Sequence, residues 1–532
     1  MKLLKKLKEI NLYKLVFVFL VLQPFLDILM CIYDEKISIL GFSIVTLIRL
    51  IFIFLIFLVS YLKDNNKTRK RILCVYLSLV FIYSVIHIFR FINFNFSLIN
   101  LVFSKGILFN EIFYIVRMTI PILLIYSFSV EKYDIKKLNK IFVTTTLVIS
   151  GIIILSNLFK VGFLSYSEDN IKRVSENIFY WFRTVQNIQG SLLMTRGFFV
   201  SANQLSVLLG ILLFINFYLS LERKKVVNYI SILCLISSMF MVGTRVASYG
   251  AILISIISFV AFIFSCVFTK RWTDLNIINL VVCVIIIGLS FFLYEKSPIK
   301  NKYIEIKQER EIAKIEYDNK KRNETNPDTS TENPCVKDLY SDRTNKHIQE
   351  VMSNYNFDEK NIFLGCNIKY YPIYNYFMNN YYPKKFNEDF WLSMMLEKYE
   401  NSMDSRYVKN RMVLDLREKN SNILDTYFGI GYTTLRNFVY LENDIICQFY
   451  TLGIFGVILF ILPYLFVAIY SLLRILLKPK MWTFKNIIFI GTILFTFCVA
   501  YFAGHVFDEF FTVFYLSFLC GQLLKLEELN ES

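Results

Sequence analysis

Long apolar stretches alternate with short polar segments over most of the chain, and this spacing predicts a bundle of membrane-crossing helices. Each stretch is roughly 17–25 residues long, the length that a helix needs to cross a bilayer. The first is followed at once by a second, so we expect a retained helix and not a cleaved signal peptide. We place twelve spans near 15–33, 39–61, 72–89, 110–129, 140–158, 200–220, 228–243, 247–268, 276–294, 445–473, 485–503 and 510–525.

Composition supports the same conclusion. The chain has 532 residues, of which 55% are hydrophobic, 17% aromatic and 19% charged. A soluble core cannot use so much apolar surface, whereas a bilayer can. We therefore predict an all-α polytopic membrane protein with about 12 transmembrane helices. Its expected parts are a membrane domain over 1–294 with an outer loop at 159–199, a large extracytoplasmic loop domain over 295–444, and a second membrane part over 445–532.

The net charge of +16 gives information on how the chain is oriented in the membrane and says little about binding partners. Lys and Arg concentrate in alternate short segments such as KLLKKLKE and KDNNKTRKR, whereas the short loops between them hold few cations. This bias is the positive-inside pattern. It predicts that both termini are cytoplasmic and that the long hydrophilic segment is outside. No nucleic-acid partner is expected.

Three charged residues, Asp27, Arg49 and Arg117, lie inside predicted spans, where an ionisable group needs a partner. We expect Asp27 to pair with Arg49 or Arg117 inside the bundle, and a direct role in substrate binding is the alternative. Residues 90–109 are apolar but broken, which predicts a re-entrant or interfacial segment.

Two further arginines stand at the starts of predicted helices. Arg196 lies about one turn before the span at 200–220, where the helix N-terminus is already partly positive. A cation there makes sense if an anion binds to it and to the free amides. Arg245 lies in a tight turn between two spans, and its planar fork suits a phosphate better than lysine does. The alternative is that Arg196 is a solvated interfacial arginine and that Ser201 and Asn203 are ordinary helix caps.

The outer segments contain several distinct patterns. The second half of 159–199 is too apolar for a free loop and is expected to pack on the outer face. Residues 300–322 predict a solvated charged helix, and 323–334 a loop-like link. The aromatic segment 367–391 could stack on sugar rings or form the core of a small lid, and we favour the lid. The segment 393–425 is predicted to be helical, and it supplies Asp404, Arg406 and Arg411. Cys335 and Cys366 lie in the same long segment and could form a disulfide.

The stretch from Phe428 to Gly456 closes the hydrophilic segment and leads into an apolar helix. A glycine-rich turn precedes Glu442, Asn443 and Asp444, which should lie at the membrane surface. A carboxylate at this edge could accept a proton, with its pKa raised by partial burial. His505, beside two acids, is either a proton relay or a structural histidine that bonds a carbonyl. The sequence has no Cys/His cluster with metal-ligand spacing, no P-loop and no serine nucleophile elbow.

Five motifs together resemble the O-antigen ligase and Wzy-type polymerase superfamily, in its low-GC bacterial variant. They are QPFLD…LIRL, TRGFFVSANQLSVLLG, MVGTRVASYGA, FGIGY…LENDIICQFYTLGIFG and AGHVFDE. The resemblance implies a glycosyltransferase-C-like fold and a donor glycan linked to a lipid pyrophosphate of the undecaprenyl type. The glycan would move to a sugar hydroxyl, or to a terminal acceptor in a ligase, without a metal, a nucleotide sugar or another cofactor.

The resemblance also assigns residues. Arg196 and Arg245 match the family positions that bind the pyrophosphate. Ligases carry a His-Asn pair where the long loop re-enters the membrane, whereas this chain has Glu442, Asn443 and Asp444. This departure favours a polymerase, with Glu442 as the base and Asp444 as the second choice. The remaining site candidates are His505 for catalysis and Arg406, Asn203 and Asn443 for substrate binding.

The expected partners are a lipid-linked oligosaccharide donor, a glycan acceptor, membrane lipid and polysaccharide-export proteins. The expected location is the bacterial plasma membrane, with the active face extracytoplasmic. Two alternatives to a polymerase or ligase stay open, namely a polysaccharide or solute transporter and a non-catalytic assembly or sensor protein. The outer domain and the lack of repeat symmetry between the two halves of the chain count against a transporter.

Overall fold

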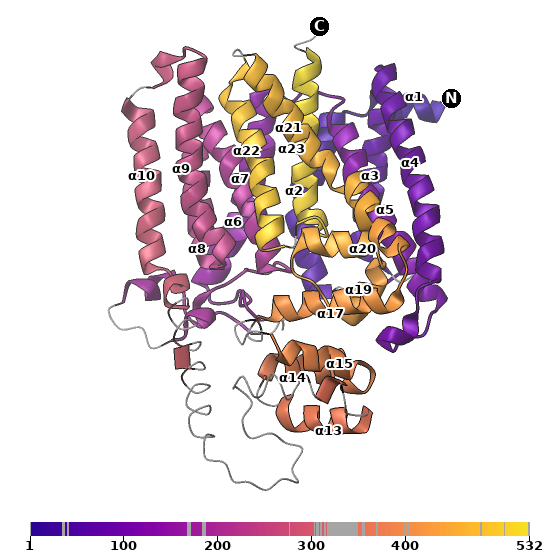
Figure 1. Ribbon diagram of the computed structural model, residues 1–532. Helices are drawn as coiled ribbons and strands as arrows, with labels where there is room; N and C mark the ends of the chain where they lie inside the picture. Colours follow the sequence, from indigo (N-terminus) through magenta and orange to yellow (C-terminus); the bar gives the residue numbers. More distant parts are fainter. Residues whose placement is uncertain are drawn as a thin grey trace.

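The computed structural model shows a bundle of long helices with a group of short helices at one end (Figure 1). It describes residues 2–33, 38–39, 42–167, 172–183, 188–275, 277–302, 357–368, 371–397, 404–478, 481–504 and 506–529, with isolated positions between 303 and 356 and at 401. Most of the expected charged helix at 300–322, the link at 323–334, Cys335, the side chain of Cys366 and His505 lie outside the described residues. The disulfide between Cys335 and Cys366 therefore stays a prediction.

The described chain is almost entirely helical. The only strands among its residues are β1 (Ser38–Ile39) and β2 (Phe42–Ser43), which pair antiparallel before α3. The helices of the first half are α1 (Lys2–Glu9), α2 (Leu12–Tyr33), α3 (Ile44–Lys63), α4 (Lys67–Ile92), α5 (Lys105–Phe128), α6 (Ile135–Leu158), α7 (Ala202–Arg223), α8 (Val226–Val242), α9 (Arg245–Phe268) and α10 (Ile277–Lys296). The short 3-10 helices are η1 (Phe96–Ile99), η2 (Ile178–Phe182), η3 (Gly190–Leu193) and η4 (Trp272–Asp274).

The second half begins with short helices and ends with long ones. The short helices are α13 (Phe357–Asn367), α14 (Pro372–Asn380), α15 (Lys384–Met395), α17 (Ser405–Asn420), α18 (Leu424–Phe428) and α19 (Tyr432–Phe438). The long helices are α20 (Asp444–Phe460), α21 (Leu462–Leu477), α22 (Phe484–Phe502) and α23 (Phe510–Leu529). We call α13, α14 and α15 the lid helices.

The hydrophobic pattern predicted the bundle correctly. Within the described residues, ten helical segments are long and apolar enough to cross a membrane, and Val226–Val242 and Phe510–Lys525 are shorter apolar helices. Each of the twelve predicted spans contains a helix, and the chain is a multi-pass α-helical membrane protein. How many of these helices cross the bilayer stays a prediction.

Helix α7 forms the centre of the bundle. The apolar stretch of α7 is entirely buried, because α6, α8, α9, α22 and α23 all pack against this helix. A helix that is apolar on all sides is stable only when neighbouring helices or lipid surround it. Many of the surrounding helices begin at a side chain that accepts an N–H bond from their first turn. These caps are Ser43, Asn66, Ser104, Asp134, Thr244, Asn443 and Thr483.

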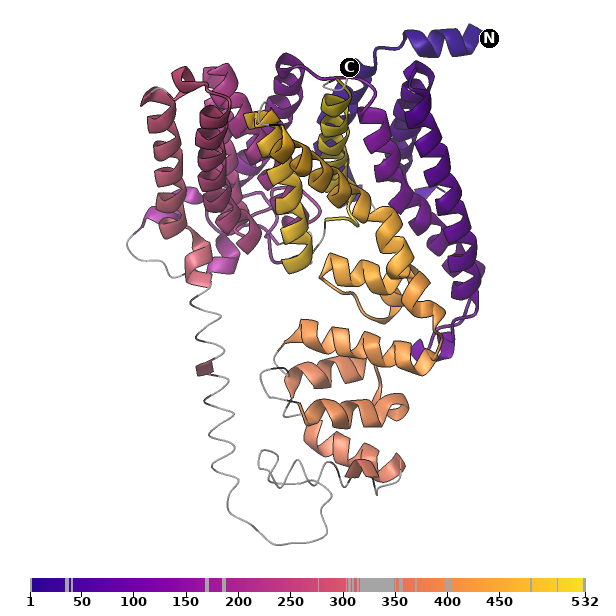
Figure 2. The same cartoon turned by 45° about the horizontal axis from the view of Figure 1, so that its top comes forward.

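The two termini lie at the same end of the bundle, and the lid helices lie beyond the opposite end (Figures 1 and 2). This arrangement agrees with the predicted topology, in which both termini share one side. A second hydrophobic core joins the lid helices to α17, to α19 and to the loop between α4 and α5. Phe94 and Phe96 of that loop are buried in this core. The loop at 93–104 therefore packs against α17 and α19 and does not re-enter the bundle, so the re-entrant alternative is wrong and the interfacial one stays a prediction.

The aromatic segment at 367–391 forms a core, as expected. Tyr374, Tyr382 and Trp391 are fully buried, and Trp391 donates a hydrogen bond to the Tyr382 carbonyl at 2.8 Å. The Tyr371 and Tyr374 rings stack with centroids 5.2 Å apart. These aromatic rings hold the short lid helices together, because helices of 9–12 residues have too little apolar surface to be stable alone.

The predicted single span at 445–473 is instead two helices, and its first half is kinked. Gly453 has φ +70° and ψ −176°, and the helix breaks again at Ile461. At the kink, the carbonyls of residues 450–452 accept hydrogen bonds from groups outside α20. Ile430 N–H donates to the Tyr450 carbonyl at 2.7 Å, and Gly431 N–H donates to the next carbonyl, that of residue 451, at 3.0 Å. The glycine-rich turn thus crosses α20 backbone to backbone.

Replacing Gly453 by alanine should lower the melting temperature of the purified protein clearly. An added Cβ would lie 2.4 Å from the Phe428 nitrogen, and the backbone angles at this position are nearly exclusive to glycine. Strain of this kind costs on the order of 1–3 kcal/mol, before the clash is counted. Gly491→Ala in α22 is the matched control, because its Cβ would meet no heavy atom within 4 Å. Equal melting temperatures for both variants would contradict the crossing.

Two buried polar side-chain pairs attach this crossing to the bundle. Glu111 of α5 accepts hydrogen bonds from the backbone N–H of Tyr432 at 2.9 Å and of Thr433 at 2.7 Å. His87 Nε2 lies 2.9 Å from the same carboxylate, and Nδ1 lies 2.6 Å from the Phe428 carbonyl. Both ring nitrogens of His87 therefore face oxygen atoms, and this side chain links α4 to Glu111 and to the glycine-rich turn. Arg90 pairs with Asp425 in the same region, and both side chains are fully buried.

Candidate functional site

A cavity of about 1060 Å³ opens between the bundle and the lid helices. Its walls come from distant parts of the chain, namely 165–167, 196–203, α14, α17 and 436–442. Arg196, Asn203 and Glu442, three of the residues predicted from sequence, line it together. The volume is at the upper end of the range that ordinary small-molecule sites occupy, so it can hold a ligand of several rings.

Arg196 is 5% exposed, and backbone hydrogen bonds fix the segment that carries it. Its N–H donates to the Phe163 carbonyl at 3.0 Å, and the neighbouring Thr195 N–H donates to the Met241 carbonyl at 2.8 Å. The apolar half of the 159–199 loop therefore packs on the bundle, as predicted. Burial lowers the pKa of the Arg196 guanidinium, and the nearby Cys31 and Asp27 oppose this shift. A guanidinium in so dry a place attracts an anion more strongly than one in water.

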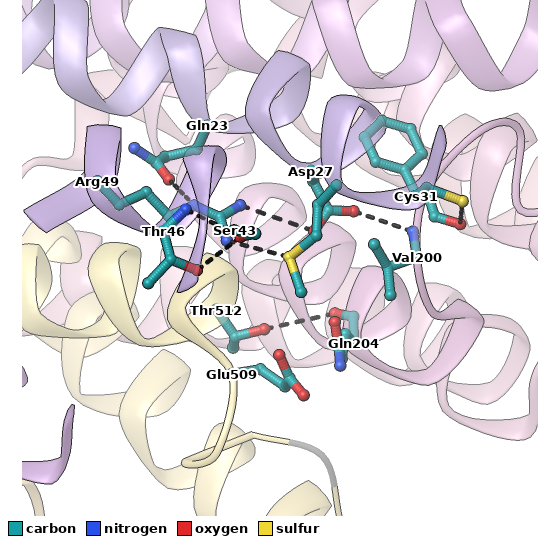
Figure 3. A network of polar contacts seen from close by, with 12 residues as sticks. Gln23, Asp27, Cys31, Ser43, Thr46, Arg49, Val200, Gln204, Glu509 and Thr512 are labelled. Atoms are coloured by element: carbon teal, nitrogen blue, oxygen red, sulfur yellow. Dashed lines mark hydrogen bonds and ion pairs between the residues drawn. The ribbon is translucent and has the colours of Figure 1, made fainter. Parts of the chain in front are cut away.

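Asp27 ties the segment that carries Arg196 to helix α2. Its carboxylate accepts the Val200 N–H at 3.0 Å and lies 3.8 Å from the Arg49 guanidinium (Figure 3). Arg49 also donates from Nε to the Gln23 side-chain oxygen at 3.1 Å. The predicted pairing of Asp27 with Arg49 is confirmed. Arg117, the other partner considered, instead lies 3.8 Å from Glu509.

The start of α7 faces the cavity. Ser201 is the N-cap residue, but its side chain makes no capping hydrogen bond, and Asn203 lies in the first turn. Both line the cavity with Arg196. The alternative that Ser201 caps the helix with its side chain is therefore wrong. The start of a helix this long attracts anions, and here it stands beside a buried cation.

Glu442 lines the cavity from the other side, where it forms two ion pairs. Arg406 Nε donates to Oε2 at 2.7 Å, and Lys409 Nζ donates to Oε1 at 3.2 Å. Burial raises the pKa of Glu442, but the two cations outweigh this effect and the pKa lies below its ordinary value. The expectation of a raised pKa was wrong for Glu442, because the sequence could not show that two cations of α17 contact its carboxylate.

Three other predicted residues hold the surrounding elements and do not line this cavity. Arg406 also donates to the Phe502 carbonyl at 3.0 Å, at the end of α22. Asn443 caps α20 through the Ile446 N–H at 3.1 Å and donates to the Tyr501 carbonyl. Asp444 is buried, and its carboxylate accepts the N–H groups of residues 506 and 507. These contacts connect α17, α20 and the α22–α23 turn. His505 lies outside the described residues.

Arg245 is the first residue of α9, and it is exposed. The tight hairpin before it is as predicted, with Gly243 at φ +62° and the Thr244 side chain accepting the Ala247 N–H at 3.1 Å. Tyr166, which lines the cavity, donates to the Gly243 carbonyl at 3.2 Å. Burial raises the pKa of Tyr166, and the Arg245 charge opposes that shift. Arg245 therefore lies near the cavity but is not among its lining residues.

Sequence reasoning missed two cations of the cavity, Lys409 and Arg436. Lys409 lies one helical turn after Arg406 on α17, a spacing that places both on one face of a helix. Arg436 follows the glycine-rich turn and donates to the Tyr432 hydroxyl at 2.8 Å. With Arg196, the described lining residues carry three cations and one carboxylate, Glu442. The cavity is therefore positive and suited to an anionic ligand.

The fold and the site define a polytopic α-helical membrane protein with a positively charged cavity beside a small helical lid. The family described as O-antigen ligase like membrane protein matches residues 10–529, so the chain belongs to this family. The resemblance seen in the sequence motifs is thereby confirmed. Membership indicates an enzymatic role in polysaccharide assembly, of the ligase or polymerase type. No curated protein and no solved structure matches the chain, so the expected glycosyltransferase-C-like fold stays a prediction.

Proposed function

We propose that this protein is a membrane glycosyltransferase that moves a glycan from a lipid-pyrophosphate donor to a sugar hydroxyl, and that it acts as a polymerase. The donor is of the undecaprenyl type, and the reaction takes place on the extracytoplasmic side of the bacterial plasma membrane. The observation that carries the proposal is that Arg196, Lys409 and Arg436 line one cavity together with one carboxylate, Glu442. Cations in this number fit a pyrophosphate and have no evident use in a purely apolar lipid pocket.

The chemistry needs each kind of residue in the cavity. The acceptor hydroxyl oxygen forms a bond to the anomeric carbon of the donor while the bond from that carbon to the pyrophosphate oxygen breaks. The electron pair of the broken bond stays on the pyrophosphate, where Arg196 stabilises the added charge. The start of α7, with Ser201 and Asn203, faces the same space and adds backbone dipoles.

Glu442 receives the proton of the acceptor hydroxyl in this proposal. Its low pKa makes it a weak base, but glycosyl transfer passes through an oxocarbenium-like transition state in which the anomeric carbon is already positive. The attacking hydroxyl becomes acidic only as the new bond forms, so a weak base in contact with it is sufficient. The ion pairs with Arg406 and Lys409 hold the carboxylate ionised and oriented towards the cavity.

Glu442→Gln should abolish glycan extension in the host while the protein stays in the membrane. Proton acceptance by one group contributes about 10²–10⁴-fold to a rate. The length distribution of the surface glycan and the pool of lipid-linked repeats are the measurements. Arg406→Gln breaks one of the two ion pairs but keeps the carboxylate and Lys409, so extension should fall less than in Glu442→Gln. The exposed control Glu418→Gln should extend glycan normally.

The same experiment separates the candidate reactions. A polymerase defect removes long glycan and leaves single lipid-linked repeats. A ligase defect leaves the glycan length unchanged, but the glycan is no longer attached to its surface anchor. Because the family is described as O-antigen ligase like, the ligase reaction is the second candidate. Normal extension and attachment in Glu442→Gln would rule out Glu442 as the proton acceptor.

A further inference from the structure

Helix α14 has two faces with different uses. Its inner face is part of the core of the lid helices, where Tyr374 is fully buried and lies 6.0 Å from Trp391 between ring centroids. Ile373, Tyr376 and Phe377, which are spaced i, i+3 and i+4, line the cavity. Phe377 is also a buried member of this core and Ile373 packs against it, so Tyr376 is the one of the three that lies outside the core. The core is complete without Tyr376, whose side chain is 54% exposed.

A second exposed tyrosine adjoins the first. Tyr381 directly follows α14, is 42% exposed and also lines the cavity. The centroids of the Tyr376 and Tyr381 rings are 5.9 Å apart, and the ring planes are inclined by 55°. The two rings form a bent aromatic surface on the wall of the cavity. Large exposed aromatic side chains that face a polar cavity are typical of a ligand contact.

The rest of the wall identifies the class of ligand. Hydroxyl and amide groups of Ser165, Ser201 and Asn203 line the same cavity as the two tyrosines. A sugar ring has an apolar face of C–H groups and a rim of hydroxyls. Aromatic rings can contact the apolar face, and hydroxyl and amide side chains can hydrogen-bond the rim. Neither a lipid chain nor a free phosphate uses both kinds of group.

We propose that Tyr376 and Tyr381 form a glycan-binding subsite that stacks on sugar rings of the acceptor. The inference rests on the proposed function, because it assigns one part of the cavity to the acceptor and the cationic part to the donor pyrophosphate. In this proposal the lid helices bind the acceptor as well as covering the cavity, because α14 positions the end of the glycan beside Glu442. Affinity for the glycan in this subsite comes from ring contact and not from charge.

The test uses the full-length protein in detergent or nanodiscs and oligosaccharides released by mild acid from the surface polysaccharide of the host. Tyr376→Ala and Tyr381→Ala should each weaken oligosaccharide binding about two- to tenfold in calorimetric titrations, the size expected for one aromatic contact. Tyr376→Phe keeps the ring and should bind as the wild type does. In extension assays, the alanine variants should raise the KM for the acceptor and leave kcat largely unchanged.

Tyr427→Ala is the matched control, because Tyr427 is 41% exposed but stacks on Phe455 and does not line the cavity. This variant should bind oligosaccharide normally. If the wild type binds no oligosaccharide, or if the Tyr376 and Tyr381 variants bind as well as it does, the subsite is wrong. That outcome differs from failure of the proposed function, in which Glu442→Gln extends glycan normally while ring removal still weakens binding.

Discussion

Replacing Arg196 by alanine is expected to stop glycan extension and to leave single lipid-linked repeats in the membrane. Arg196 is nearly inaccessible to water and lines the cavity, and its backbone N–H donates to the Phe163 carbonyl, which fixes this point of the chain. Donors that are fixed in a dry site stabilise the charge of a transition state without having to reorganise, and removing one costs about 10²–10³-fold in rate. Glycan length and the pool of lipid-linked repeats measure the effect.

Two further variants make this prediction specific. Arg196→Lys keeps the charge but loses the planar fork, so extension should be intermediate. Arg183→Ala removes an exposed arginine of the same outer loop that does not line the cavity, and extension should be normal. Membrane levels of all three variants must match that of the wild type. Normal glycan length in Arg196→Ala would show that the donor pyrophosphate does not bind in this cavity.

Asp425→Ala is expected to give the largest loss of stability of any single change proposed for this protein. Asp425 and Arg90 are both fully buried, and the Asp425 carboxylate also accepts a hydrogen bond from Asn420 at 2.7 Å. Removing one member of a buried pair leaves the other charge without compensation, which costs about 3–5 kcal/mol. We expect a large fall in melting temperature and faster hydrogen exchange in α17, α18 and α19.

A double variant distinguishes charge burial from loss of packing. Arg90→Leu combined with Asp425→Leu removes both charges and keeps apolar volume, so it should recover much of the lost stability. Glu418→Ala, an exposed acid at the end of α17, is the control and should change stability little. If Asp425→Ala melts as the wild type does, this ion pair does not attach the α17–α19 region to the bundle.

The predicted site residues show how far local patterns lead. Arg196 and Asn203 lie within a few residues of each other at a helix start, so their shared position in the cavity could be inferred from the chain alone. Glu442, which was predicted to be the base, lines the cavity, but its two cationic neighbours were not predicted. Its partners Arg406 and Lys409 precede it by more than thirty residues, and only the packing of α17 on the start of α20 brings them into contact.

Asn443 and Asp444 show the opposite case. They are polar residues at the predicted membrane edge and resemble site residues in sequence. In the structure, the Asn443 side chain caps α20, and Asp444 binds backbone N–H groups at the α22–α23 turn. A sequence pattern cannot separate a carboxylate that binds substrate from one that binds backbone, because the same group and the same depth serve both purposes.

Hydropathy and short motifs are properties of contiguous residues, so they were enough to identify the chain as a multi-pass helical membrane protein of this family. The sequence also predicted the tight hairpin at Arg245, and it favoured the pairing of Asp27 with one of two arginines and an aromatic core in the lid helices. Three features became evident only in the folded chain. Gly453 breaks α20, Lys409 and Arg436 line the cavity, and Tyr376 and Tyr381 face it while Tyr374 does not. These features depend on which distant helices pack together, and no local pattern encodes that choice.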